Sequence, residues 1–393
     1  MQERDFSSRK YFPGTEGGPF ELILRLTKPI ESIPGFLFAS LLFGLALLIN
    51  TQEPLRAAIL WVFFLGDWGI MVLLRKGKRS FGPPKPPALL LAVLRSILGW
   101  LPIPALLVIQ SIGTLLVIYS FWYEPLHIVV TTVELNVPEL PQGYHLRVLH
   151  LGDLHLERLT MREHRLIELV HDLRPDLILF SGDFLSFSTV DDPEAIREAN
   201  WLLSQLDAPL GCFAVTGSPP VDLEHSVQQI ITGTGWRLLR DERVVLGEDD
   251  ARFDLYGVSC THRPFVDGPK LENLIEEDGE SFGILLYHSP DLAPVAARLG
   301  IKLQLSGHTH GGQVRLPFFG AVYTSSLYGK RLEAGCYRIG SMMLYVTRGI
   351  GLEGKGAPRV RFLCPPEMTL WTLQGAPAEP GEPELPPRIV QAD

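Results

Sequence analysis

Two histidines separated by one residue form the pattern with the clearest chemical meaning in this sequence. His308 and His310 lie in the segment Gly307-His308-Thr309-His310-Gly311, directly after an apolar run that ends at Leu305. The flanking glycines permit a tight turn, so both imidazoles can point towards one place. Neutral imidazoles suit zinc, iron, manganese and other borderline cations. The pattern indicates a metal site at the end of a strand, although a single His-x-His pair is weak evidence.

An apolar run that stops at a polar side chain occurs four more times. These runs end at the segments Asp153-Leu154-His155, Gly182-Asp183, Gly217-Ser218 and His288-Ser289. Short apolar runs separated by helix-length stretches are typical of strands buried on both faces. In such α/β arrangements the ligand site lies beyond the carboxyl ends of the strands. We therefore expect one site to contain Asp153, His155, Asp183, His288, His308 and His310.

These motifs, in this order, resemble those of the calcineurin-like metallophosphoesterases. The likeness rests on Asp153-x-His155, Gly182-Asp183, His288 and Gly307-His308-Thr309-His310, and it covers roughly residues 144 to 374. It continues through residues 311–317, 348–351 and 364–367, which are similar to the membrane-associated bacterial branch of that superfamily. The resemblance implies a four-layer α/β/β/α sandwich preceded by a helical transmembrane region.

The resemblance also implies a role for each site residue. Asp153, His155 and His310 would bind a first metal ion, His288 and His308 a second, and Asp183 would bridge the two. The implied cofactors are two divalent ions: manganese, iron or zinc. Two such ions about 3.5–4 Å apart can hold a phosphoryl oxygen and activate a water for in-line attack. The residues assigned to catalysis are Asp153, His155, Asp183 and His308.

One family motif is broken. The superfamily has Gly-Asn-His-Asp or Gly-Asn-His-Glu after the third strand, where this chain has Gly217-Ser218-Pro219-Pro220. Ser218 is a poor replacement for the amide ligand, and Pro219 cannot donate a proton. The second metal site should therefore be the weaker one. The loss of a general acid typically costs about 10²–10⁴-fold in rate. Three nearby residues are candidates to compensate: Asp222, Glu224 and His225.

The first third of the chain is unusually apolar for a soluble enzyme. Charge-poor stretches cover residues 34–50, 57–74 and 88–123, with tryptophans near their ends or turns. Segments of about 20 apolar residues match a bilayer core of about 30 Å. We therefore predict a cytoplasmic segment over 1–33 and a transmembrane helical region over 34–123. The alternative is a set of buried helices in a soluble domain.

The sequence leaves the side of the membrane open. A basic loop should stay in the cytoplasm; it contains Arg75, Lys76, Lys78, Arg79 and Lys85. Arg95 would cost about 2.5–3.5 kcal/mol at the bilayer centre, which favours 105–121 as the last span and a non-cytoplasmic catalytic domain. If 88–101 also crosses, the domain lies in the cytoplasm. Asp67 is expected to be structural, near the membrane surface or paired with a basic side chain.

The rest of the chain should form a phosphoesterase domain over 124–374 and a disordered, Pro- and Glu-rich tail over 375–393. Side-chain spacing predicts helices over 161–173 and 194–206. Strands are predicted over 126–137, 176–181, 282–287, 335–340, 343–347, 360–363 and 368–373. His150 should lie in a strand core or on the sheet surface. His262 could approach the substrate or serve only its loop, and Arg348 could contact an anion.

Composition narrows the function further. The net charge of −9 offers no basic surface for nucleic acid. Four widely spaced cysteines, with no Cys-x-x-Cys pair, give no evidence of compartment. The sequence identifies no protein partner.

The prediction is a membrane-anchored, metal-dependent phosphoesterase that hydrolyses a phosphodiester or phosphomonoester. The expected partners are the lipid bilayer and a phosphate ester substrate, which could be lipid-linked because the protein is anchored in the membrane. The alternative is a catalytically impaired relative that serves as a binding or sensing module. A transporter has only Asp67 in its favour.

Overall fold

The computed structural model describes residues 1–15, 19–275, 281–353, 356–375 and 388–392. The chain divides into two compact units. The sandwich unit comprises Met1–Gly18, His127–Leu352 and Leu363–Asp393, and the helical unit comprises Pro19–Leu126 and Glu353–Phe362.

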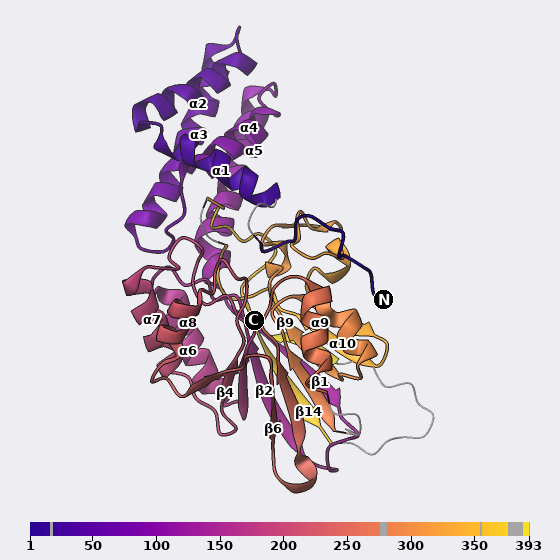
Figure 1. Ribbon diagram of the computed structural model, residues 1–393. Helices are drawn as coiled ribbons and strands as arrows, with labels where there is room; N and C mark the ends of the chain where they lie inside the picture. The colour runs from indigo at the N-terminus through magenta and orange to yellow at the C-terminus, as the bar shows by residue number, and fades with distance from the viewer. Residues whose placement is uncertain (16–18, 276–280, 354–355, 376–387, 393) are drawn as a thin grey trace. The chain divides into compact units, whose positions relative to one another are not determined.

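The sandwich unit is built on two stacked sheets (Figure 1). The first sheet has the order β15 (Arg388–Ala392), β1 (Val129–Asn136), β14 (Glu367–Gln374), β2 (His145–Leu151), β3 (Leu177–Phe180), β4 (Cys212–Ala214), β5 (Trp236–Leu238). The second has the order β12 (Gly335–Ile339), β13 (Met342–Val346), β9 (Leu303–Ser306), β8 (Phe282–Leu286), β7 (Phe253–Gly257), β6 (Glu242–Leu246). Strands β2 to β5 are mutually parallel, as are β7, β8, β9 and β13. Their carboxyl ends therefore provide one edge in each sheet.

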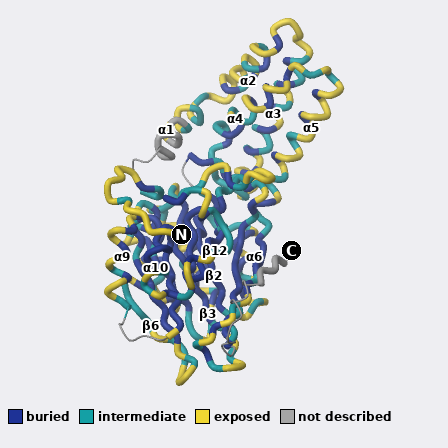
Figure 2. Tube along the Cα trace, turned by 90° about the vertical axis from the view of Figure 1, so that its right-hand side faces the viewer, coloured by how far each residue is buried: buried dark blue, intermediate teal, exposed yellow. Residues whose placement is uncertain are grey.

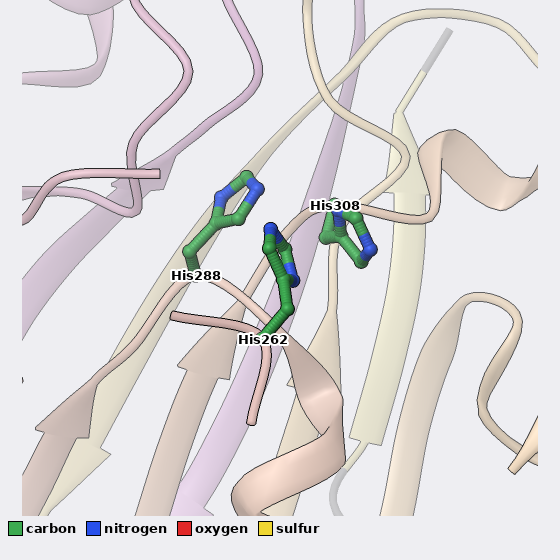
Figure 3. A group of neighbouring side chains, drawn as sticks. All are labelled: His262, His288 and His308. Carbon is green, nitrogen blue, oxygen red and sulfur yellow. The ribbon is translucent and has the colours of Figure 1, made fainter. Parts of the chain in front are cut away.

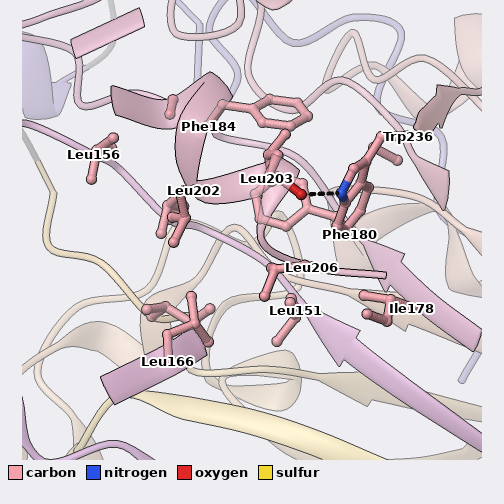
Figure 4. Packing of buried hydrophobic residues seen from close by; sticks show 14 of the residues in the cluster. Leu151, Leu156, Leu166, Ile178, Phe180, Phe184, Leu202, Leu203, Leu206 and Trp236 are labelled. Carbon is pink, nitrogen blue, oxygen red and sulfur yellow. Dashed lines mark hydrogen bonds between the residues drawn. The ribbon is translucent and has the colours of Figure 1, made fainter. Parts of the chain in front are cut away.

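Helices cover the outer faces of both sheets. The first sheet packs against α6 (Met161–Leu173), α7 (Pro193–Ser204) and α8 (Glu224–Ile231). In this layer the Trp236 indole Nε1 donates to the Leu203 carbonyl at 3.0 Å (Figure 4). The second sheet packs against α9 (Pro264–Glu272) and α10 (Ala293–Arg298). A third apolar cluster fills the space between the sheets, and Figure 2 shows the buried strands inside. The four-layer α/β/β/α prediction is confirmed.

Local sequence explains where the two long outer helices begin. Thr160 and Glu163 form a reciprocal capping box at the start of α6. Asp192 accepts the backbone N–H groups of Glu194 and Ala195 at the start of α7, and Pro193 occupies its first position. The helices predicted over 161–173 and 194–206 agree with these bounds.

The first fifteen residues pack on the sandwich unit. The Phe12 side chain is buried in the apolar cluster beneath α9 and α10. The Phe6 and Tyr328 rings lie 5.4 Å apart, and Arg298 Nε lies 3.2 Å from Glu3 Oε2. The structure therefore joins the start of the segment predicted over 1–33 to the sandwich.

The helical unit contains α1 (Pro19–Ser32), α2 (Gly35–Ile49), α3 (Pro54–Lys76), α4 (Lys85–Ser96) and α5 (Ile103–Ile118). A π-turn (Tyr119–Tyr123) and a 3₁₀ turn (Glu124–Leu126) continue α5. Within the part of the chain that the structure describes, two helices are long and apolar enough to cross a membrane: Pro54–Lys76 and Ile103–Leu126. Large apolar side chains lie on the outside of the unit, including Phe36, Leu48, Val62 and Leu115.

An ion pair lies inside the helical unit. Arg95 Nη1 donates to Asp67 Oδ2 at 2.6 Å, and both side chains are buried. Arg95 Nη2 donates to Thr114 Oγ1 at 2.9 Å and also to the Gln110 carbonyl. Asp67 is thus paired with a basic side chain, one of the structural roles that the sequence allows.

Two predictions of local structure were wrong. Residues 360–363 do not form an extended strand; Glu353–Phe362 joins the helical unit, where the Arg361 backbone N–H donates to the Ser120 carbonyl at 3.0 Å. In the tail predicted to be disordered, Arg388–Ala392 pairs antiparallel with β1. The alternation Arg-Ile-Val-Gln-Ala includes two β-branched residues that favour a strand. Residues 376–387 and 393 lie outside the described residues.

Candidate metal centre

The polar residues predicted at strand ends meet at one edge of the sandwich. Asp153 and His155 follow β2, Asp183 follows β3, Ser218 follows β4, His288 follows β8, and His308 and His310 follow β9. Backbone hydrogen bonds join the loops: Asp153 N donates to the Gly182 carbonyl at 2.9 Å, and Gly307 N donates to the His288 carbonyl at 2.8 Å. All these polar side chains are buried.

The side chains form overlapping groups of possible metal ligands. One group is Asp153, His155 and His310; a second is Asp153, Asp183 and His288; a third is His262, His288 and His308. Within each group the ligand atoms lie within 4.8 Å of one another. The Asp183 Oδ2 atom is 3.4 Å from His155 Nε2 and 3.3 Å from His288 Nε2, so this carboxylate lies between these two histidines.

These distances fit bound cations. Zn–N bonds of about 2.0–2.1 Å place neighbouring ligand atoms about 2.9 Å apart at a right angle and about 3.4 Å apart in a tetrahedron. The His155 and His310 Nε2 atoms are 2.9 Å apart, and the Asp183 contacts fall in the same range. Two carboxylates and several imidazoles also match the chemistry of zinc, iron or manganese. The residues present therefore fit divalent metal ions.

Hydrogen bonds to backbone carbonyls orient two of the imidazoles. His288 Nδ1 lies 2.9 Å from the Ser181 carbonyl, and His308 Nε2 lies 3.1 Å from the Ser325 carbonyl. A carbonyl only accepts, so each of these nitrogens carries the proton. His288 Nε2 and His308 Nδ1 are then the nitrogens that could bind a metal, an arrangement common around protein-bound metals.

Two glycines make room for the carboxylates. A Cβ at Gly217 would lie 2.2 Å from Asp183 Oδ1, and a Cβ at Gly307 would lie 2.4 Å from Asp153 Oδ2. In return, backbone N–H groups hold the carboxylates in place: Ser218 N donates to Asp183 Oδ1 at 2.6 Å, and His308 N donates to Asp153 Oδ1 at 2.9 Å.

Six residues of this centre share an uncommon backbone conformation. Positive φ angles, between 41° and 73°, occur at Asp153, His155, Asp183, His262, His308 and His310. None is glycine, and this conformation costs a residue with a side chain about 1–3 kcal/mol. Such outliers cluster at functional sites, where the surrounding structure enforces them.

Burial shifts the pKa of three groups in the centre, Asp153, His308 and His262. It raises the pKa of Asp153 to about 6, with the charge of Asp183 adding to the effect and His288 opposing it. Burial, together with the neighbouring His288, lowers the pKa of His308 to about 3. Burial and the neighbouring His308 hold the pKa of His262 well below its usual value. His308 and His262 are therefore neutral near pH 7, as a metal ligand must be.

The broken motif has a defined place in the centre. Ser218 Oγ lies 3.3 Å from Asp183 Oδ2 and 3.3 Å from His288 Nε2, whereas Pro219 is exposed. Asp222 contacts the segments that follow β3 and β4. Its carboxylate accepts the backbone N–H groups of Asp183 (2.8 Å), Phe184 (2.9 Å) and Gly217 (2.6 Å). It positions the loop.

The other two candidates lie on the surface. His225 pairs with Asp191, both largely exposed, and Glu224 pairs with Arg240. Neither of these two side chains belongs to a group of possible ligands.

His262 belongs to the centre, although from the sequence a role confined to its loop was at least as strongly expected. Its Nε2 atom lies 3.0 Å from Ser218 Oγ, and its ring faces His288 and His308 (Figure 3). A signal was present, because His262 follows the strand β7 at the same edge as the other ligands. Four residues separate it from that strand, so it lacks the short spacing of the other motifs.

Two further residues have structural partners. His150 is buried in β2, where its Nε2 atom lies 3.1 Å from Ser181 Oγ. Arg348 Nη2 donates to Glu367 Oε1 at 2.9 Å. The guanidinium is therefore engaged by a carboxylate.

Several known proteins with similar sequences are metallophosphoesterases. The uncharacterized metallophosphoesterase YkuE of Bacillus subtilis (strain 168) is 30% identical over 270 residues, 65% of this chain and 89% of YkuE. An uncharacterized metallophosphoesterase of Aquifex aeolicus (strain VF5) is 31% identical over 281 residues, 67% of this chain and 98% of the relative. UDP-2,3-diacylglucosamine pyrophosphatase LpxG of Chlamydia trachomatis serovar D is 26% identical over 307 residues, 63% of this chain and 89% of LpxG. No family model matches the chain.

The fold and the centre define a metal-dependent hydrolase of phosphoric esters. The chain belongs to the metallophosphoesterase family.

Proposed function

We propose that the protein is a membrane-anchored phosphoesterase with a dinuclear centre. Asp153, His155 and His310 hold the first ion, His288 and His308 hold the second, and Asp183 bridges them. The observation that carries this proposal is the position of Asp183 Oδ2, 3.4 Å from His155 Nε2 and 3.3 Å from His288 Nε2.

Two bound divalent ions would polarise a phosphoryl oxygen and lower the pKa of a water to about 7. The chain's own residues prepare the site for them. Asp153 and Asp183 offset the cationic charge, and the neutral imidazoles add ligands without adding negative charge. Backbone N–H groups fix both carboxylates, so that the positions of the ligand atoms are set before substrate binds.

Protonation of the leaving group is the weak step. Pro219 stands where the superfamily has an imidazole, and its ring cannot donate a proton. Esters with acidic leaving groups need little protonation, so they should react faster than alkyl esters. If even activated esters are not hydrolysed, the chain is instead a metal-binding sensing module.

Metal analysis combined with hydrolysis tests the proposal. The purified full-length chain should contain divalent metal and hydrolyse bis-p-nitrophenyl phosphate or p-nitrophenyl phosphate. Asp183→Asn should lose both metal and activity, whereas the surface variant His225→Ala should keep both. A metal-free wild-type chain would refute the proposal.

A lipid-linked phosphoester is the substrate class we favour. The relative LpxG is named for a pyrophosphatase reaction on UDP-2,3-diacylglucosamine. In this chain a short hairpin, β10 (Arg315–Leu316) and β11 (Gly320–Ala321), follows His310 closely. Its turn exposes the aromatic side chains of Phe318 and Phe319, and Val322 and Tyr323 beyond it are also exposed. An exposed apolar cluster beside a catalytic centre suits an acyl chain.

Substitution at the hairpin tests this substrate class. Phe318→Ser should raise KM about 10-fold for a diacyl phosphoester in detergent micelles, because burial of a Phe side chain contributes about 1.5–3 kcal/mol. KM for bis-p-nitrophenyl phosphate should not change. Val245→Ser, an exposed residue on β6, is the matched control. Equal KM values for the micellar ester in Phe318→Ser and wild type would exclude the hairpin from lipid binding.

We further propose that the catalytic domain lies on the cytoplasmic side, the second alternative left open by the sequence. Contacts within the helical unit define two ends. At one end Lys85 Nζ donates to the Glu31 and Ile33 carbonyls at 2.6 and 2.7 Å, and Arg79 lies over the Trp122 ring. At the other, Arg56 Nη1 donates to the Trp100 carbonyl at 3.4 Å.

Helices α2 to α5 therefore run alternately between the two ends. The start of α2, the basic loop and the exit towards His127 share one end, which we call the basic end. Basic loops remain in the cytoplasm. The cost assigned to Arg95 no longer argues against its helix, because Asp67 pairs with it. The packing of residues 1–15 on the sandwich unit agrees, since both termini of the helical unit then lie on one side.

A further inference from the structure

We infer that His262 is a ligand of the second metal ion and replaces the asparagine missing at Ser218. This inference rests on the dinuclear function proposed above. It assigns the fourth protein ligand of the second site, beside Asp183, His288 and His308, to the loop between β7 and α9, outside the broken motif.

Geometry places the ring within the second site. The ligand nitrogens of His262, His288 and His308 all lie within 4.8 Å of one another. The ring centroid of His262 is 4.3 Å from that of His308 and 5.6 Å from that of His288 (Figure 3). The Nε2 atom lies 3.0 Å from Ser218 Oγ, so it points to the position that an asparagine amide at 218 would occupy.

The Ser218 side chain is too short to replace the asparagine as a metal ligand, but it leaves space for the His262 ring. Its hydroxyl lies between Asp183, His288 and His262, at 3.3, 3.3 and 3.0 Å. A longer amide at 218 would extend towards the His262 ring. A short residue at 218 and an imidazole at 262 therefore complement each other.

The backbone around His262 is held in an unfavourable conformation. His262 has φ +61°, like the other proposed ligands Asp153, His155, Asp183, His308 and His310. Its neighbour Thr261 is fixed by Asp267, whose carboxylate accepts both the Thr261 N–H and hydroxyl. This conformation costs about 1–3 kcal/mol, and such residues cluster at functional sites, where the surrounding structure enforces them.

The N-terminal segment closes the outer side of the ring. Gly14 has φ +76°, and a Cβ there would lie 2.3 Å from His262 Nε2. Phe12, next to it, packs against Phe265 with ring centroids 5.9 Å apart. The ring is 1% exposed. This position suits a metal ligand better than a proton donor, which must reach the substrate.

Metal stoichiometry in the full-length chain tests the assignment. Each variant is equilibrated with Mn²⁺, and bound metal is counted by mass spectrometry while electron paramagnetic resonance distinguishes a spin-coupled Mn²⁺ pair from a single ion. Wild type should bind two ions and give the coupled signal. His262→Ala should bind one ion tightly and lose the coupled signal, with the second affinity reduced at least 10–100-fold, the loss typical even of an outer-shell partner. The surface variant His225→Ala should match wild type.

Two further variants separate ligation from simple misfolding. Ser218→Asn in the His262→Ala background should recover the coupled signal, because the amide supplies the missing ligand. Gly14→Ala should weaken the second ion without altering any ligand, whereas Gly143→Ala, with φ +80° and no atom within 4 Å of the added Cβ, should not. If His262→Ala keeps two ions at wild-type affinity, the assignment is wrong while the proposed function stands. A wild-type chain that binds no metal would instead remove the proposed function itself.

Discussion

The residues of the metal centre are held by the loops rather than by their strands. Six of them have left-handed backbone conformations, and Gly217 and Gly307 let the carboxylates approach the neighbouring backbone closely. The sequence predicts which residues lie at the strand ends, because the apolar runs stop there. It does not predict the φ angles, which depend on contacts between loops distant in sequence.

Restoring the broken motif should raise activity in a way that depends on the leaving group. We expect Pro219→His, with Ser218 kept because a longer side chain there would crowd His262, to increase kcat for alkyl phosphodiesters by about 10-fold or more, since general acids contribute about 10²–10⁴-fold. Aryl esters should gain less. Pro219 is exposed, so an imidazole there can reach substrate. Pro220→His is the matched control, and kcat is measured across a series of leaving groups. A uniform gain on all esters would argue against a proton-donor role.

Asp222 should matter for stability even without metal. Its carboxylate accepts three buried backbone N–H groups, at Asp183, Phe184 and Gly217. Because each unsatisfied buried donor costs about 1–3 kcal/mol, Asp222→Ala should lose about 3 kcal/mol or more. Asp222→Asn keeps an acceptor oxygen and should lose less. Thermal unfolding of the chelator-treated chain measures both. The exposed control Asp191→Ala should change Tm little. If Asp222→Ala has the same Tm as wild type, the loop does not depend on the Asp222 carboxylate.

At the scale of elements, alternation and capping predict most of the sandwich. The helices over 161–173 and 194–206 and the inner strands follow from side-chain spacing, since their partners only need to be apolar. The segments 360–363 and 388–392 were predicted wrongly because each is short and contacts neighbours that are distant in sequence. Arg361 contacts Ser120, and Arg388–Ala392 pairs with β1. The role of His262 was not predicted firmly, because it depends on the loop after β7 placing His262 beside His288 and His308, which follow other strands.

The Asp67–Arg95 pair should stabilise the helical unit as a pair. Asp67→Leu would leave Arg95 buried without its carboxylate, which typically costs about 3–5 kcal/mol. Asp67→Leu/Arg95→Leu should regain most of that loss. The fraction of protein that remains monodisperse after heating in detergent provides the measurement. Glu53→Leu breaks the more exposed Arg56–Glu53 pair and should have little effect. A double variant as unstable as the single one would mean that packing, rather than charge pairing, is lost.

At the scale of the whole molecule, the proposed topology makes the position of both termini testable. The basic end of the helical unit contains Lys85, Arg79 and the exit to His127, and residues 1–15 pack on the sandwich. Both chain ends should therefore lie in the cytoplasm, and the turn at residues 50–53 should lie outside. This holds even if α2 and α4 cross only part of the bilayer, because each helical hairpin returns to the basic end.

Reporter fusions to the full-length chain measure this directly. Green fluorescent protein after Asp393 or before Met1 should fluoresce, and alkaline phosphatase at the same positions should be inactive. Alkaline phosphatase inserted after Gln52 should be active, which controls for expression and membrane insertion. If both termini report the outside, the orientation is reversed but the packing of the N-terminal segment on the sandwich survives. If the two termini report opposite sides, the chain crosses an odd number of times, and residues 1–15 cannot pack on the sandwich unit of their own chain.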